Sequence, residues 1–462
     1  MSLSDKLNFP DVKRQAASAK QYSRVVPPKS GVEFKEGQVI EFAIPGNQPT
    51  SYLDCTNNLR IELPVTVTAA AGVFLDRAGA YSLIQQYELV QNGTVIGRVP
   101  KYNVLMTALA DIDMSAEYKS TTGRALIGTE GDSLRGCFMA GGVERKFFIS
   151  LLASEFTMFT PNRSLWLGSG AEIVLRLTLE KNAVGLVGAA GSTYEIKRPQ
   201  CHMNITELTA ESQSQLDEQT GGDYQMLCNS YDHASMSVAT GVSSLDQVLG
   251  FGSGSLERIM FTIRPQATAL LADSFSLGHR VTGNLSEYQF RVGNDQFPQV
   301  PIQVNADGAE AMSNLLMADN SVSDYSKGVS GLMNSFTLNT SSFGGGTSSL
   351  GSQPQIIKTN PYTAFPGTDT GGKLFGDSVF GGAGSASTIG TSLYAIDFET
   401  SLSTSKNAPI YSGVNTLNGV QLYINAKFGT AGTPVPMMID YFALSTELIY
   451  LNRSTNLWSK RK

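Results

Sequence analysis

The chain contains one pattern twice, as YELVQNGTVIGRVP at Tyr87–Pro100 and as YQFRVGNDQFPQVP at Tyr288–Pro301. The two copies align without a gap when residue 87 is placed on residue 288. Each begins with alternating apolar positions, continues with an Asn and a Gly side by side, and ends in a short apolar run before Val-Pro. Neighbouring Asn and Gly tolerate the positive φ angles of a tight turn, so each copy predicts a β-hairpin.

A short helical pattern follows each predicted hairpin. It covers YNVLMTALAD at Tyr102–Asp111 and AEAMSNLLMAD at Ala309–Asp319. Because the hairpin and the helix recur together in the same order, the sequence indicates two copies of one domain.

The composition favours an all-β protein with many turns, since the 462 residues include 46 Gly and only 16% are charged. No run of apolar residues is long enough to cross a membrane as a helix. Met1–Arg24 lacks the apolar core of a signal peptide, so we expect a soluble chain that is not secreted by a signal peptide. The four Cys and three His are scattered without a CxxC motif, which argues against a disulfide framework or a structural zinc site.

The net charge of −6 is unevenly distributed along the chain. Residues 1–30 and residues 449–462 each carry +4, which leaves the rest of the chain acidic. Basic ends on an acidic body indicate that both ends face an anionic partner, either nucleic acid or a lipid surface. The alternative is that they only keep the ends solvated. The candidate contact residues are Lys6, Lys13, Arg14, Lys20, Arg24, Arg453, Lys460, Arg461 and Lys462.

Alternating apolar residues predict the strands of the first half, at 40–44, 59–67, 147–152, 173–179 and 194–208. Pro64 lies within the second of these, so we expect that strand to lie at a sheet edge or to bend.

Three other segments of this half lack a strand pattern. Residues 1–30 contain three prolines and are predicted to be an arm that orders only on a partner. Residues 114–145 are predicted to be a mostly polar link, and residues 209–225, with Gly221 and Gly222, the linker between the halves.

The second half repeats this order with strands at 259–263, 394–398 and 420–428. Its later strands align at a larger offset, which places a net insertion within residues 320–393. This interval is rich in Gly, Ser and Thr, and a loop of such length is functional or disordered rather than scaffold, so we expect it at the surface. Each half thus predicts two antiparallel sheets packed face to face.

This order of elements resembles the double jelly-roll major capsid proteins of the adenovirus, tectivirus and polinton-like virus lineage. The resemblance is one of element order over roughly residues 35–450, and the chain is short for a hexon, with its one large insertion in the second half only. The similar segments are SYLDCTNNLRIELPV at Ser51–Val65, YSLIQQYELVQNGTVIGRVPKYNVLMTALAD at Tyr81–Asp111, RIMFTIRP at Arg258–Pro265 and YQFRVGNDQFPQVPI at Tyr288–Ile302.

The resemblance implies two tandem jelly-roll β-sandwiches, each with a short helix after its hairpin. The predicted domains are an N-terminal arm at 1–30, a first jelly roll at 31–215, a second jelly roll at 216–448 that contains the 320–393 insertion, and a basic C-terminal tail at 449–462.

The function that the resemblance implies is that of a viral major capsid protein. Three copies would form a pseudo-hexagonal capsomer, and capsomers would tile an icosahedral shell around the genome. The expected partners are the homotrimer, neighbouring capsomers, penton and minor capsid proteins, and viral DNA or an internal membrane at the basic ends. We expect the protein in the virion, assembled inside the infected host cell, without a cofactor or a small-molecule substrate.

Motifs for catalysis are weak in this sequence. GTDTGGK at Gly367–Lys373 resembles a phosphate-binding loop, but Leu374 stands where the magnesium-binding Ser or Thr is required. His202, His233 and His279 lie in no nucleophile motif, and we expect them to be structural.

Asp111, Asp113 and Glu117 are the one carboxylate group whose spacing suggests a divalent cation. They lack the ligand spacing of a calcium loop, so an acidic helix end is the simpler interpretation.

Two other classes of function fit a pair of β-sandwiches. A carbohydrate- or receptor-binding protein, such as a spike or a lectin-like protein, would favour exposed Trp and Tyr, but the chain has only two Trp. A β-sandwich glycosidase needs two convergent carboxylates, and the sequence singles out no such pair. We therefore predict a structural protein and no enzyme.

Overall fold

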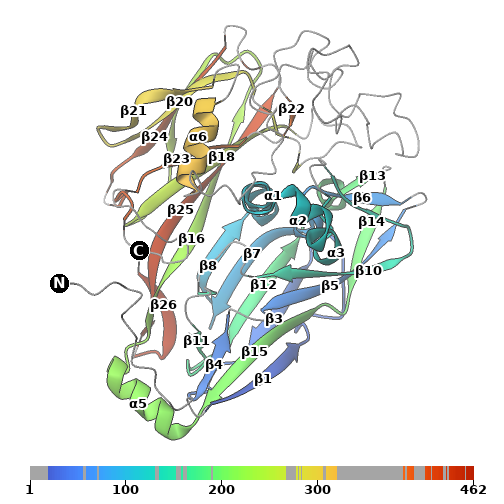
Figure 1. Ribbon diagram of the computed structural model, residues 1–462, viewed down its shortest axis with the longest axis vertical. Coiled ribbons are helices and arrows are strands. Elements are labelled where there is room, and N and C mark those ends of the chain that lie inside the picture. The colour runs from blue at the N-terminus through green and yellow to red at the C-terminus, as the bar shows by residue number, and fades with distance from the viewer. Residues whose placement is uncertain are drawn as a thin grey trace, which may run out of the picture.

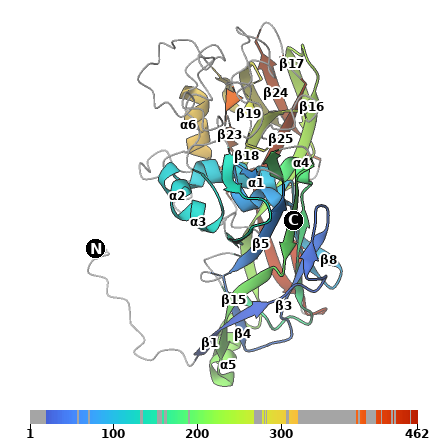
Figure 2. The ribbon, with the colours of Figure 1, turned by 90° about the vertical axis from the view of Figure 1, so that its right-hand side faces the viewer.

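The computed structural model describes most of the chain between Ala19 and Arg461 (Figures 1 and 2). The described residues are 19–55, 59–69, 72–130, 135–151, 158–159, 164–188, 191–266, 277–278, 280–281, 283–304, 309–319, 389–390, 393–399, 412–417, 419–429, 433, 436–452 and 454–461. The predicted insertion at 320–393 lies almost entirely outside them.

The first half is built around two antiparallel sheets, which we call 1a and 1b. Sheet 1a has the strand order β11-β4-β15-β5-β14-β2, with β1 paired to β15 and β10 paired to β5, and sheet 1b has the order β3-β12-β7-β8. The strands of 1a are β1 (Ala19–Val26), β2 (Glu33–Phe34), β4 (Ser51–Asp54), β5 (Arg60–Thr68), β10 (Glu144–Ser150), β11 (Leu165–Trp166), β14 (Thr193–Lys197) and β15 (Gln200–Leu208). The strands of 1b are β3 (Val39–Ile44), β7 (Ile84–Gln91), β8 (Thr94–Pro100) and β12 (Ile173–Leu179).

Shorter elements surround this sandwich. A small sheet has the order β13-β6-β9, and helices lie at the ends of the strands. These elements are β6 (Val73–Asp76), β9 (Arg135–Met139), β13 (Leu186–Gly188), the 3-10 helix η2 (Gly79–Leu83), α1 (Tyr102–Asp113), α2 (Ala116–Ser120), α3 (Thr122–Leu126), α4 (Asn182–Gly185) and α5 (Ala210–Thr220).

The second half contains the matching sheets 2a and 2b. Sheet 2a has the order β16-β25-β18-β23 with β26 paired to β25, and sheet 2b has the order β17-β24-β20-β21. The elements of this half are β16 (Gln225–Val238), β17 (Ser244–Leu249), β18 (Leu256–Pro265), β19 (Arg280–Val281), β20 (Leu285–Val292), β21 (Asp295–Gln303), α6 (Ala309–Ala318), β22 (Ile389–Gly390), β23 (Tyr394–Asp397), β24 (Leu422–Phe428), β25 (Met437–Asn452) and β26 (Leu457–Arg461).

The two halves have equivalent topologies. In sheets 1b and 2b, β3, β12, β7 and β8 correspond in order to β17, β24, β20 and β21. In sheets 1a and 2a, β5 pairs with β10 and β15 just as β18 pairs with β23 and β25. The prediction of two copies of one β-sandwich is therefore confirmed.

The repeated hairpins and helices form as predicted. Asn92 and Gly93 have φ angles of 48° and 78° and connect β7 to β8 as a two-residue turn. In the second copy Gly293, with φ of 59°, begins the turn between β20 and β21. Helices α1 and α6 follow the respective hairpins.

Alternating burial in the strands places the core between the two sheets of each half. In β12, for example, Ile173, Leu175, Leu177 and Leu179 are buried while the residues between them are half-buried. This is the pattern of a strand with one face on a core and the other face toward water.

Of the two alternatives predicted at Pro64, a sheet edge or a bend, the sheet edge is wrong. Strand β5 has partners on both sides, with Pro64 opposite Lys146 of β10. On its other side β15 pairs with residues 60–62 and β14 with residues 65–68, so Pro64 lies between these two ladders. No strand pairs with Pro64 on that side, where a residue without an N–H interrupts no ladder.

Four other segments differ from the sequence prediction. Residues 19–26 of the predicted arm form β1, paired with β15 along its whole length, so this part orders within the chain itself. The strand predicted at 194–208 is divided into β14 and β15 by a turn at Arg198, whose φ is 51°. The polar link at 114–145 contains α2, α3 and β9, and the linker at 209–225 contains α5.

Helix α5 lies at one end of the molecule, next to the ends of β1, β4 and β15 (Figures 1 and 2). We call this end the base. Strands β16 and β25 extend from the second sandwich toward the base, and β16 contacts β8 of the first (Figure 1).

The core of the second half supports a direct test. Phe261 packs against Tyr288, Tyr394 and Tyr441, with ring centroids 5.1 to 5.6 Å apart. We expect Phe261→Ala to lower the free energy of unfolding by about 3–5 kcal/mol, measured by urea denaturation, because it leaves a cavity among these rings. The matched change Val300→Ala, at a residue 71% exposed, should stay within about 0.5 kcal/mol of wild type. Equal effects would contradict the packing described.

Candidate functional site

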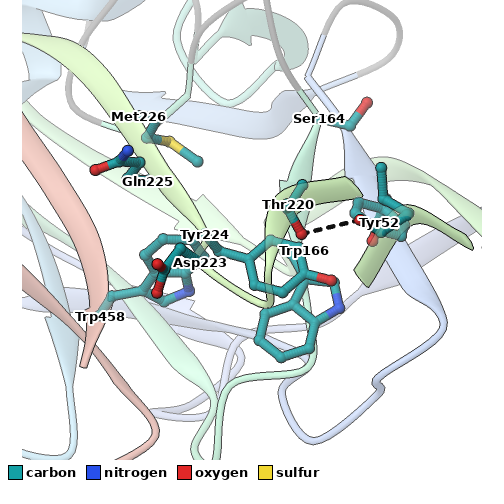
Figure 3. A pocket seen from close by; sticks show the side chains of 10 residues that line it. Tyr52, Ser164, Trp166, Thr220, Asp223, Tyr224, Gln225, Met226 and Trp458 are labelled. Atoms are coloured by element: carbon teal, nitrogen blue, oxygen red, sulfur yellow. Dashed lines mark hydrogen bonds between the residues drawn. The ribbon is translucent and has the colours of Figure 1, made fainter. Parts of the chain in front are cut away.

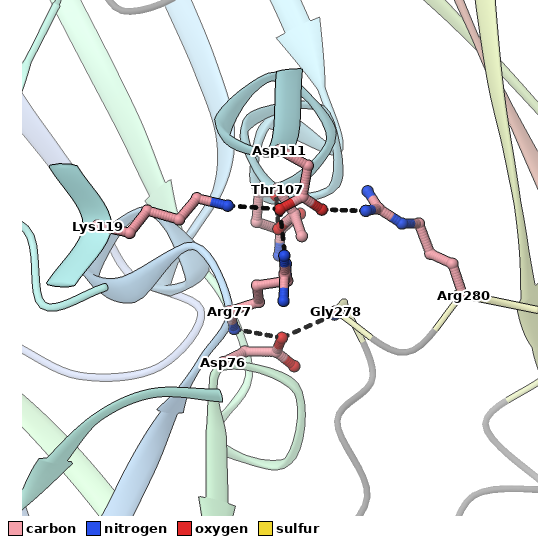
Figure 4. Close-up of polar contacts among 8 residues, drawn as sticks. Asp76, Arg77, Thr107, Asp111, Lys119, Gly278 and Arg280 are labelled. Carbon is pink, nitrogen blue, oxygen red and sulfur yellow. Dashed lines mark hydrogen bonds and ion pairs between the residues drawn. The ribbon is translucent and has the colours of Figure 1, made fainter. Parts of the chain in front are cut away.

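A buried carboxylate joins the two halves of the chain. Asp111, in the last turn of α1, accepts hydrogen bonds at Oδ1 from Arg77 Nε and Lys119 Nζ, both at 2.6 Å. Its Oδ2 accepts one from Arg280 Nη2. Figure 4 shows the three basic side chains converging on Asp111 from different elements: Arg77 follows β6, Lys119 belongs to α2, and Arg280 lies in β19 of the second half.

These four side chains are at most 2% exposed to solvent. Removing charges from water is costly unless each one is paired and hydrogen-bonded. Asp111 accepts a hydrogen bond from each of the three cations, although Arg280 Nε and Nη1 have no partner among the described residues. The cluster therefore holds together three segments of the first half, α1, α2 and the end of β6, and β19 of the second.

The pKa shifts follow from burial and from the charges within the cluster. Burial disfavours the ionised form of Asp111, but Arg77, Lys119 and Arg280 outweigh it and hold the pKa of Asp111 well below its usual value. Burial lowers the pKa of Lys119 to about 8, against the attraction of Asp111. The pKa of Arg280 is also lowered by burial.

A second carboxylate, Asp76, binds the backbone of the second half. Its oxygens accept hydrogen bonds from the N–H groups of Leu277 and Gly278, at 3.0 and 2.7 Å, and from Arg77 N at 2.6 Å (Figure 4). Asp76 is fully buried, and burial raises its pKa to about 6 although these donors favour the charged form.

The C-terminal strands contact the first half near the base. Asn456 O accepts a hydrogen bond from Gly170 N at 2.7 Å, and Trp458 N donates to Gln91 Oε1 at 2.8 Å. We use the term seam for these two contacts together with those of Asp76 and Asp111. The seam thus joins the halves through β26 at one level and through α1 and β19 at another.

The candidate basic residues occupy different environments. Lys20 and Arg24 lie exposed on the same face of β1. Lys460 of β26 forms an ion pair with Glu447 at 2.5 Å, so its charge is already compensated. Arg461 also lies in β26. Lys6, Lys13, Arg14, Arg453 and Lys462 lie outside the described residues.

The other residues singled out from the sequence have structural surroundings. His202 Nε2 lies 3.1 Å from Glu62 Oε2, and His233 Nε2 lies 3.0 Å from Asp440 Oδ1. Such carboxylate partners agree with the prediction of structural histidines. His279, and GTDTGGK at 367–373, lie outside the described residues.

The interpretation of Asp111 as part of an acidic helix end was incomplete. Its carboxylate is saturated by basic side chains, and the described residues contain no group of His, Cys, Asp and Glu suited to a metal ion. Sequence reasoning missed Arg77 and Arg280, its partners. The available signal was DR at 76–77, a charged pair inside the apolar run VFLDRAGAYSL.

Cys55, Cys137, Cys201 and Cys228 are all buried, and none of them forms a disulfide bond. The described helices include none with the length and apolar character that a membrane span requires.

The fold of the whole chain is that of double jelly-roll major capsid proteins. PBCV-1 VP54, in a crystal structure fitted into a reconstruction of the virophage Sputnik, matches with a TM-score of 0.56 and 12% identity over 98% of this chain and 99% of VP54. The Faustovirus major capsid protein matches with a TM-score of 0.57 and 9% identity over 96% of this chain and 92% of its own. A chain of the Sputnik virophage structure matches with a TM-score of 0.52 and 9% identity over 100% of this chain and 92% of its own.

No family model matches the sequence, and no curated protein matches it either. The likeness is therefore carried by the order and arrangement of the strands. The predicted fold, two tandem jelly rolls with a short helix after each hairpin, is confirmed.

The role of Asp111 in the seam can be tested by removing its charge. We expect Asp111→Asn to lower the free energy of unfolding by about 3–5 kcal/mol in urea denaturation, because it leaves buried cations without their counter-ion. The control is Glu172→Gln, which breaks the half-exposed pair with Lys29 and should cost about 1 kcal/mol or less. A loss at Asp111 no larger than that of the control would refute its role.

Asp76 gives the stability a defined pH dependence. Its folded pKa of about 6 lies above the ordinary value of 3.8, so the folded state holds the proton more tightly. The contribution of Asp76 to the free energy of unfolding is up to about 3 kcal/mol. It is fully present below about pH 4 and is lost as the pH rises through 6. We would measure the free energy of unfolding by urea denaturation from pH 4 to 7. Asp76→Asn should remove the part of its pH dependence that comes from Asp76. The part from Glu257, whose pKa burial raises to about 7, should remain. An unchanged pH slope would contradict this assignment.

Proposed function

We propose that this protein is a viral major capsid protein that assembles as trimers into an icosahedral shell around a genome. The observation that carries the proposal is the repeated sheet order of two sandwiches in one chain, shared over nearly the full length of PBCV-1 VP54 and the Faustovirus major capsid protein. A fold alone does not fix function, so the experiment below tests assembly directly.

The architecture supports a particular kind of assembly. A chain with two similar lobes gives six similar lobes when three copies close into a ring, which resembles a hexagon in outline. Closed rings of this kind use heterologous contacts, in which one surface of each copy meets a different surface of the next. Hexagonal units of one size then tile a flat face.

The partners that we propose are the other two copies of the trimer, neighbouring capsomers, and penton and minor capsid proteins.

The seam supports this role because a capsomer must keep its lobes in a fixed arrangement. Asp111 and Asp76 bind the second half through a side chain and through two backbone N–H groups. Contacts of this kind have directional geometry, unlike apolar packing, so they set the orientation of the two sandwiches.

We further propose that the chain divides into an arm at 1–30, jelly rolls at 31–215 and 216–448, and a tail at 449–462, with 320–393 on the outer surface of the shell. The basic residues Lys20 and Arg24 support an inner face directed at viral DNA or an internal membrane, because both are exposed on β1 near the base. The protein would then reside in the virion after assembly inside the host cell.

The decisive measurement is the mass of the purified protein in solution. We expect light scattering behind a sizing column to give about 149 kDa, three times the chain mass of 49.5 kDa, and negative-stain images to show six-lobed outlines or closed shells. A monomer of 49.5 kDa that fails to assemble at any concentration or salt tested would overturn the proposal. A glycan-array screen would then test the carbohydrate-binding alternative.

A further inference from the structure

A groove of about 320 Å³ lies at the base, where α5, the first half and the C-terminal strands meet (Figure 3). We call it the base groove and define it by Tyr52, Trp166, Leu216, Thr220, Tyr224 and Trp458. Its walls are mostly apolar. Its volume is at the small end of ligand pockets, so it suits one or two side chains rather than a folded domain.

The base groove is built from contacts that fix its aromatic wall. The rings of Trp166 and Tyr224 stack with centroids 4.2 Å apart and planes 2° apart. A side chain at Gly168 would overlap the Trp166 ring, since its Cβ would lie 2.0 Å from that ring. Tyr52 OH donates to Gln213 Oε1 at 3.0 Å, and Gln213 Nε2 donates to Tyr224 OH at 2.8 Å, which attaches α5 to both halves.

One polar group in this wall has no partner. Trp166 Nε1 donates to Pro49 O at 2.8 Å. Trp458 is only 3% exposed, yet its Nε1 has no hydrogen-bond acceptor in the part of the chain that the structure describes. A buried N–H without an acceptor is costly. A ligand that brings a carbonyl oxygen next to apolar groups would remove this cost.

One acidic residue, Asp223, lines the groove, and the sequence around it is acidic. Helix α5 and the residues after it contain Glu211, Asp217, Glu218 and Asp223, and the sequence has no Lys or Arg between Arg198 and Arg258. The last turn of α5 also lacks a basic residue, although the negative end of a helix dipole favours a cation there. The groove therefore fits an apolar segment that carries positive charge.

Residues 6–14 of this chain, KLNFPDVKR, have that chemistry. Leu7, Phe9 and Pro10 provide apolar groups, Lys6 and the Lys13-Arg14 pair provide the charge, and the backbone provides carbonyl oxygens. Pro10 favours an extended conformation at Phe9, and extended, proline-containing segments bind aromatic grooves with indole N–H donors.

The position of β1 favours a groove on a neighbouring copy. Ala19, at the start of β1, pairs with Leu208, at the end of β15 and beside the first turn of α5. The described chain therefore begins at the base. The ten residues from Phe9 to Ala19 can span up to about 35 Å when extended, which is long enough to reach an adjoining base.

We propose that residues 6–14 of one copy occupy the base groove of a neighbouring copy, with Phe9-Pro10 against the aromatic wall and a backbone carbonyl on Trp458 Nε1. This inference rests on the proposed function, because it requires assembled copies. It links copies through their bases.

The test uses the full-length chain with a photo-crosslinking benzoylphenylalanine at position 9. Irradiation of the assembled protein should give covalent dimers on a denaturing gel. Mass spectrometry should place the crosslinks of position 9 within residues 216–226 or at Trp458. Light scattering of the same sample reports whether the copies assemble.

Three variants of the groove make the test specific. Thr220→Arg adds bulk and positive charge at the groove, and should reduce the dimer yield at least tenfold. Ser214→Arg adds the same charge to an exposed position of α5 outside the groove, and should change the yield less than twofold. Trp458→Phe keeps a ring but loses the N–H, and should reduce the yield about fivefold, the effect of one hydrogen bond.

Two outcomes would overturn the proposal. If trimers form but the crosslinks fall within single chains or outside the groove, the inference fails while the proposed function stands. If the protein remains monomeric and yields no dimers, both fail.

Discussion

The arrangement of the two sandwiches depends on one requirement, that the cations buried between them share a hydrogen-bonded counter-ion. Asp111 supplies the negative charge for Arg77, Lys119 and Arg280, which come from three separate elements. Each cation would be costly to bury alone, so the elements that carry them must meet at the carboxylate. A purely apolar contact would tolerate sliding by a fraction of a residue. A carboxylate bound at both oxygens does not, because hydrogen bonds weaken steeply with distance and angle.

The two halves have the same sheet order but differ in the segments that follow the hairpin helices α1 and α6. After its hairpin helix the first half continues into α2 and α3, and Lys119 of α2 reaches the seam. In the second half the corresponding helix α6 ends near Asp319, whose Oδ1 lies 3.4 Å from Arg258 Nη1, while that guanidinium also donates to Ala318 O at 2.8 Å. Both helix ends thus place an aspartate beside an arginine. The two arginines are not equivalent in position, since Arg258 lies in β18, the counterpart of β5, whereas Arg77 follows β6.

Local features were predictable from the sequence, whereas contacts between distant residues were not. The hairpin at Asn92-Gly93 and the strand at Ile173–Leu179 follow from turn chemistry and from alternation, which act within a few residues. The position of Pro64 depends on where β14 and β15 end, which no local pattern encodes. Two of the three partners of Asp111, Arg77 and Arg280, lie 34 and 169 residues away in sequence. The base groove combines residues of both halves for the same reason.

The order of strands has a consequence for synthesis of the chain. Strand β25 lies at the centre of sheet 2a, paired with β16 on one side and β18 on the other, and among the described strands only β26 follows it. On the ribosome the first sandwich can therefore fold early, while β16 and β18 emerge long before their shared partner. Their unpaired edges are the kind of surface on which nascent chains aggregate. Translation that pauses before residue 437 would leave a half-built molecule that depends on chaperones.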